Sequence, residues 1–104
     1  MSVTIGKVET FPDAKPDKAQ ILKVLEECAE VFAAWQQAVE SAEIDKLTGQ
    51  NLTTKWAVND LIYECADLIQ ATSNLLAGLG VDDMTDAMEQ CRMRNVERGR
   101  YGEQ

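Results

Sequence analysis

The stretch DKAQILKVLEECAEVFAAWQQAVES spans residues 17–41 and sets the fold class. Its apolar side chains recur at spacings of 4, 3, 4, 3 and 4, the pattern of a helix that packs against another helix. The residues of this stripe are Ile21, Leu25, Cys28, Phe32, Trp35 and Val39. Asp17 at the start is a good helix N-cap. We therefore expect a first helix over residues 17–41 with its apolar stripe buried against a partner.

A second stripe with the same spacing follows after a polar segment. It comprises Leu61, Cys65, Leu68, Thr72, Leu75 and Leu79. Thr53 or Thr54 could cap this second helix, and Gly78 or Gly80 could end it. The polar segment 42–52 is expected to be a loop, with a possible helical turn near residues 44–47.

A third helix is expected from Asp82 or Asp83 to about Arg98, where Gly99 would stop it. The chain of 104 residues fits one small domain. Residues 1–16 form an N-terminal arm with a possible short strand, and residues 17–104 form the helical domain. The expected fold is all-α, a helical hairpin plus a third helix.

A domain of this size buries only a modest fraction of its surface as a monomer. We therefore expect oligomerisation to complete a four-helix bundle, in a homodimer or homotetramer.

Composition excludes several classes of protein. The net charge is −8 and the sequence pI about 4.4, so nucleic-acid polymers would be repelled, although metal ions can bridge an acidic protein to a polyphosphate. No apolar run is long enough for a membrane span. The N-terminal residues lack the basic and apolar regions of a secretory signal, so we expect a cytoplasmic protein. The three cysteines are expected to be reduced core residues.

Two pairs of carboxylates stand out inside apolar helical sequence. Glu27 with Glu30, and Glu64 with Asp67, are each three residues apart and so share a helix face. Lys23 can pair with Glu27, but the other three acids have no Lys or Arg three or four residues away. A solvated surface face is the plain alternative. We favour a divalent metal site, with Mg²⁺ as the cofactor and Mn²⁺ as a possible substitute. The absence of histidine argues against a di-iron bundle.

These motifs resemble those of a known family. Residues 26–30 (EECAE) resemble the EExxE motif of the MazG-type all-α nucleoside triphosphate pyrophosphohydrolases, and residues 64–67 (ECAD) resemble their ExxD motif. Residues 94–100 (RNVERGR) resemble the Asn and Arg cluster that closes many members. Phosphoribosyl-ATP pyrophosphohydrolases share this pattern. The resemblance covers about residues 20–100, although the segment between the two acidic motifs is longer than in compact members.

The resemblance implies a nucleotide substrate and a metal-assisted hydrolysis. Glu27, Glu30, Glu64 and Asp67 would hold Mg²⁺, which would clamp a triphosphate and activate water to attack the α-phosphorus. The products would be a nucleoside monophosphate and pyrophosphate. Glu26 would orient the water or support the metal ligands, unless it is only a surface charge.

The resemblance also suggests residues that contact the substrate. Asn95 and Arg98 would bind phosphate oxygens, unless they are only charges and polar groups favoured at a helix end. Lys55 is a further phosphate candidate. Trp35 would pack in the core or stack on the base. Two other functions stay open, a phosphoribosyl-ATP pyrophosphohydrolase and a non-catalytic helical interaction module.

Overall fold

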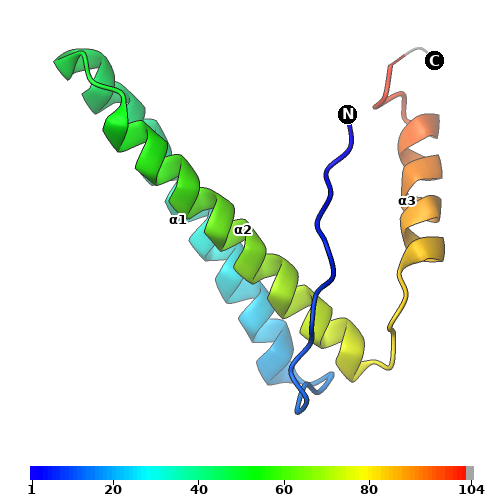
Figure 1. Ribbon diagram of the computed structural model, residues 1–104. Helices are drawn as coiled ribbons and strands as arrows, with labels where there is room; N and C mark the ends of the chain where they lie inside the picture. Colours follow the sequence, from blue (N-terminus) through cyan, green and yellow to red (C-terminus); the bar gives the residue numbers. More distant parts are fainter. Residues whose placement is uncertain (103–104) are drawn as a thin grey trace.

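The computed structural model describes residues 1–102 and contains three α-helices (Figure 1). The first two, α1 (Lys18–Thr48) and α2 (Leu52–Gly78), pack against each other as a long antiparallel hairpin. The third, α3 (Thr85–Glu97), follows a short connection. An extended N-terminal arm contacts the second half of α2 and then continues into the space between the hairpin and α3, and the described residues contain no strand. The all-α class and the three helices are confirmed, whereas the possible strand in the arm is not formed.

The helix α1 begins as predicted and ends later than predicted. The Asp17 carboxylate accepts a hydrogen bond from the Gln20 amide at 3.0 Å and caps the first turn. At the other end, residues 42–48 continue the helix, so the predicted loop is wrong over most of its length. The reason is tertiary. The extended helix places Asp45, only 5% exposed, where its Oδ2 accepts a hydrogen bond from the Thr54 amide at 2.7 Å.

That hydrogen bond supplies the cap that the start of α2 lacks. The helix begins at Leu52, before the two threonines that were predicted to cap it, and Asn51 makes no side-chain cap hydrogen bond. The first N–H groups of a helix have no partner within the helix. Asp45, from the preceding helix, provides one.

The side of α1 that faces α2 lies one residue away from the predicted stripe. It is made of less exposed positions at the same 3 and 4 spacing, namely Val24, Glu27, Val31, Ala34, Ala38 and Ser41. Small residues there, together with the buried Ala57 and Ala71 of α2, let the two helices approach closely. One residue corresponds to about 100° of rotation, so the large apolar side chains lie on the flank of the hairpin.

The expectation that the first stripe is buried is therefore wrong for the single chain. Its large side chains are 40–64% exposed: Ile21, Leu25, Phe32, Trp35 and Val39. The same rotation leaves Cys28 exposed, and Cys65 of α2 is exposed too. The cysteines are free, as expected, but these two are not core residues.

The arm is attached to α2 by polar contacts and by a close approach of two backbones. The Phe11 amide donates to the Asn74 side-chain oxygen at 3.0 Å, and the Gln70 amide group donates to the Glu9 carbonyl at 2.9 Å. Near the end of α2, a Cβ added to Gly78 would lie 2.6 Å from the backbone carbon of Lys15. Only glycine allows the chain to pass so close.

The helix α3 stands apart from the hairpin. It begins at Thr85, later than predicted, after Asp83 accepts hydrogen bonds from the Thr85 amide and hydroxyl. Gly99, at φ 70°, stops it as predicted. Among the described residues, α3 packs against neither α1 nor α2. Figure 1 shows the hairpin and α3 diverging, with the arm between them.

The result is an open molecule. Its accessible surface is 8518 Å², against about 5,800 Å² for a compact monomer of this mass. Its radius of gyration is 17.3 Å, against about 13 Å for a compact domain. No described helix has the length and apolarity needed to cross a membrane.

Candidate metal centre

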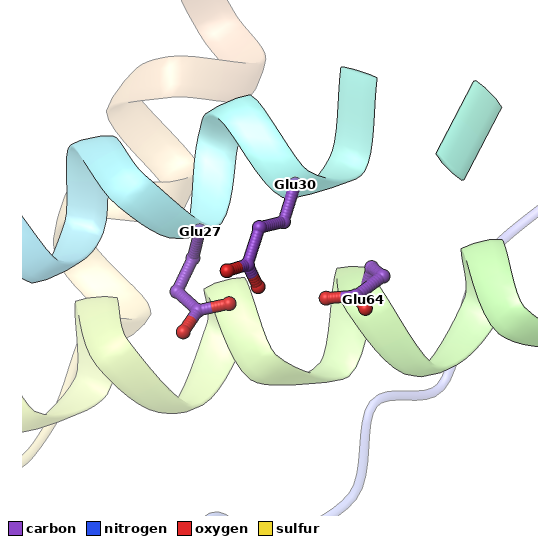
Figure 2. A group of neighbouring side chains, drawn as sticks. All are labelled: Glu27, Glu30 and Glu64. Carbon is purple, nitrogen blue, oxygen red and sulfur yellow. The ribbon is translucent and has the colours of Figure 1, made fainter. Parts of the chain in front are cut away.

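Three glutamates from the two long helices meet midway along the hairpin. One carboxylate oxygen from each of Glu27, Glu30 and Glu64 lies within 4.8 Å of the others (Figure 2). Glu27 lies on the side of α1 that faces α2, and Glu30 lies one turn further along, at the edge of that side. Glu64 reaches them from α2, so the site exists only because the helices pack in this register.

The site is partly closed to water. Glu27 is 6% exposed, Glu64 is half-buried and Glu30 is exposed. Oε2 of Glu27 and Oε2 of Glu64 are buried and have no hydrogen-bond partner within residues 1–102. A buried ionised oxygen without a partner is costly. Two such atoms beside a third carboxylate form a donor set that suits a hard cation.

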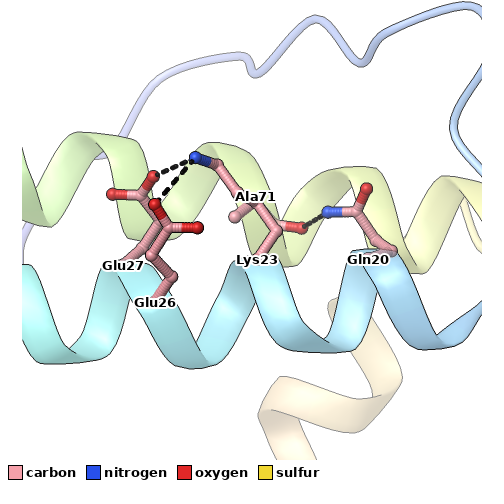
Figure 3. Close-up of polar contacts among 5 residues, drawn as sticks. All are labelled: Gln20, Lys23, Glu26, Glu27 and Ala71. Atoms are coloured by element: carbon pink, nitrogen blue, oxygen red, sulfur yellow. Dashed lines mark hydrogen bonds and ion pairs between the residues drawn. The ribbon is translucent and has the colours of Figure 1, made fainter.

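Lys23 is the one cation paired with this group in the described part of the chain. Its Nζ lies 3.1 Å from Oε1 of Glu27 and 3.7 Å from Oε1 of Glu26, as the sequence predicted (Figure 3). The hydrogen bond to Glu27, helped by the charges of both glutamates, raises the pKa of Lys23. Nearby, the Gln20 side chain donates to the Ala71 carbonyl at 2.9 Å and ties α1 to α2.

One lysine does not neutralise three acids. The pKa of Glu30 is raised, and the largest cause is the negative charge of Glu27. A hydrogen bond to Glu27 and the nearby Glu64 add to this effect. The folded chain therefore brings together carboxylates that repel one another. Such a cluster stays fully ionised more readily when a cation is bound.

A groove of about 380 Å³ opens beside the cluster and runs between the helices. Its polar lining comes from Glu30 and Gln37 of α1 and from Asp60, Tyr63 and Glu64 of α2. Sequence reasoning missed Gln37, Asp60 and Tyr63 as site residues. Helical spacing could have found two of them, because Gln37 lies two turns beyond Glu30 and Asp60 lies one turn before Glu64.

The other predicted residues lie outside the group of three. Asp67 is exposed and is not among the converging carboxylates, and the side chain of Glu26 is 57% exposed beside Lys23. Lys55 is exposed and does not line the groove. Trp35, 52% exposed, packs neither in the core nor in the groove but stacks on Phe32, with 5.9 Å between ring centroids.

Asn95 and Arg98 belong to the end of α3 and are not brought to the carboxylates within one chain. The Asn95 side chain is held locally. Its amide donates to the Cys91 sulfur at 3.6 Å, and its oxygen accepts from Arg100 at 3.3 Å. Arg98 is exposed. The separation follows from the lack of packing between α3 and the hairpin.

Comparisons with family models, with curated proteins and with solved structures found no match for this chain.

Proposed function

We propose that this chain is a Mg²⁺-dependent pyrophosphohydrolase of the MazG type, which cleaves a nucleoside triphosphate to a monophosphate and pyrophosphate. The observation that supports it most is the convergence of Glu27, Glu30 and Glu64, with two buried oxygens that lack partners. When bound, a divalent cation supplies positive charge against the triphosphate and the Lewis acidity that activates an attacking water.

The chain's own residues would divide the work by their positions. Glu27 and Glu64 would hold the cation between the helices, and Glu30 would hold it at the mouth of the groove. Lys23 fixes the orientation of Glu27 through the 3.1 Å ion pair. Gln37 and Tyr63 line the groove that leads away from the acids and would contact the rest of the nucleotide. Asp67 would bind a second cation or contact the first cation from its solvent-exposed side.

The direct test is pyrophosphate release from a panel of nucleoside triphosphates in millimolar Mg²⁺. Glu30→Gln and Glu64→Gln should each reduce turnover at least a hundredfold, because each removes a charged ligand and preserves its shape. Glu40→Gln is the matched control, since this exposed α1 residue lies outside the cluster. A wild-type protein that releases no pyrophosphate from any triphosphate would refute the hydrolase. Release from phosphoribosyl-ATP alone would identify the narrower enzyme.

A second candidate is a non-catalytic helical interaction module. The observation that favours it is the exposed flank of α1, which carries five large apolar side chains. This module would bind no metal and release no pyrophosphate. Its melting temperature would not respond to Mg²⁺, whereas a metal site formed only in the folded state must raise it.

We also propose self-association for either function. The chain exposes about 2,700 Å² more than a compact monomer of its mass, and a stable interface needs about 800 Å² from each partner. The apolar flank of one hairpin against that of a second copy would complete the predicted four-helix bundle. Sedimentation at micromolar concentration tests this, and a monomer would refute it.

A further inference from the structure

The helix α3 has apolar residues, and among the described residues it packs against neither α1 nor α2. It is 13 residues long, and isolated helices shorter than about 12–15 residues are marginal in water. Met88 is 57% exposed and Cys91 is half-buried beside the end of the arm. A helix of this length needs a packing partner, and the described hairpin does not supply one.

The flank of α1 also exposes apolar side chains, and it offers a surface on which a helix could pack. Its apolar stripe of Ile21, Leu25, Phe32, Trp35 and Val39 is continuous over five turns and exposed throughout. We call these five residues, together with Cys28, the α1 stripe. The α1 stripe is longer than α3, so one α3 fits along it and leaves apolar surface for the contact between hairpins.

Charge favours the same pairing. The helix α1 has six acidic and three basic side chains, whereas residues 85–102 have four arginines and three acids. The ion pairs found among the described residues involve Lys23 and no arginine. The arginines of one copy can therefore approach the acidic helix of another without breaking an existing ion pair.

We propose that α3 of one copy docks on the α1 stripe of a second copy, and that the exchange is reciprocal about a twofold axis. The apolar side of α3, centred on Met88 and Cys91, covers the α1 stripe near Cys28. This inference rests on the self-association proposed above and not on hydrolysis, and it confines the contact between the two hairpins to the part of the α1 stripe that α3 leaves uncovered. The two-copy arrangement gives α3 its missing partner and buries the excess surface of each chain.

The native cysteines provide the test, because Cys28 and Cys91 lie near the middle of the two surfaces. One variant, Cys65→Ser with Cys91→Ser, keeps only Cys28, and another, Cys28→Ser with Cys65→Ser, keeps only Cys91. The two are mixed, allowed to exchange subunits and treated with a short bismaleimide. We expect far more covalent dimer in the mixture than in either variant alone. The control pairs the Cys91 variant with one that keeps only Cys65.

A covalent dimer from the Cys28 variant alone, with no gain on mixing, would mean that hairpins meet without α3 and would overturn the proposal. The proposal would also be overturned if the mixture of the Cys91 variant with the Cys65 variant gave as much covalent dimer as the mixture with the Cys28 variant. A second measurement is sedimentation of Met88→Glu, which should weaken the dimer at least tenfold. Gln90→Glu adds the same charge about 200° around the helix and should weaken it much less. Equal effects of these two substitutions would also refute the docking.

The two proposals fail separately. A protein that melts higher with Mg²⁺ and releases pyrophosphate, but shows no cross-link between Cys28 and Cys91, retains the hydrolase and loses the exchange of α3. A dimer cross-linked between Cys28 and Cys91 that releases no pyrophosphate retains the exchange of α3 and loses the hydrolase.

Discussion

Replacing Glu64 by Gln should have opposite effects on stability without and with a divalent cation. An oxygen of Glu64 lies within 4.8 Å of one of Glu27. Two like charges at that distance repel by about 3.5 kcal/mol at an effective dielectric near 20. Glutamine keeps the shape and removes the charge. Because the site is partly solvated, we expect Glu64→Gln to raise the free energy of unfolding by about 1–3 kcal/mol in EDTA.

With Mg²⁺ the order should reverse. At a cation concentration of about 1,000 times Kd, wild-type protein gains about 4.1 kcal/mol. A gain of 1 kcal/mol moves Tm by roughly 4–8 °C in a domain of this size. Glu64→Gln should gain far less, since one of three ligands has lost its charge.

The assay is thermal melting of both proteins in EDTA and in Mg²⁺, at one fixed protein concentration because association also stabilises. Glu40→Gln should follow the wild type in both buffers, since Glu40 is exposed and outside the cluster. The reasoning is refuted if Glu64→Gln is less stable than wild type in EDTA, or if Mg²⁺ stabilises it as much as it stabilises the wild type.

Three further predictions follow from local geometry. The Glu27 charge raises the pKa of Glu30, so a carbon NMR titration should show Glu30 taking up its proton at a pH above the usual range of a glutamate. Glu27→Gln should lower the pKa of Glu30. A Glu30 titration that is unchanged in this variant would contradict the clustering. Hydrogen bonds from the Thr54 side chain and amide lower the pKa of Asp45, so Asp45 stabilises the fold above its unfolded pKa and loses this effect as the pH falls through its folded value. Asp45→Ala should thus lower Tm at neutral pH and speed amide exchange at Thr54, with the Tm difference shrinking in acid; a difference independent of pH would argue against the cap. Gly78→Ala should lower Tm although alanine favours helices by about 0.5–1 kcal/mol, because its Cβ would meet the Lys15 backbone at 2.6 Å; a higher Tm would show that the arm does not hold this position.

The features that the sequence predicted well depend on residues close together in the chain. The Asp17 cap bonds Gln20, three residues on, and Gly99 ends α3 through its own φ of 70°. Lys23 reaches Glu27 one turn away at 3.1 Å. Each of these contacts is set by helix geometry alone, so the amino-acid order is enough to place it.

Periodicity was misleading about which side of α1 is buried. Two adjacent stripes have the same 3 and 4 spacing, and one of them contains the larger apolar residues. Those larger residues, such as Phe32 and Trp35, are exposed in the single chain, while Ala34 and Ser41 face α2. A repeat every three or four residues shows that a helix has an apolar side. It does not show whether that side meets the same chain or a second copy.

The sequence by itself determined three helices, the Asp17 cap of α1, the Gly99 stop of α3, the two acidic motifs and the strong net negative charge, because these follow from local propensity and composition. Only the tertiary structure decided that Glu64 joins Glu27 and Glu30 while Asp67 stays outside, that Asp45 caps α2, and that α3 leaves the hairpin. The physical reason is register. The sliding and rotation of α1 against α2 are fixed by packing between small side chains far apart in the sequence, and a shift of one residue turns a helix by about 100° and changes which carboxylates meet.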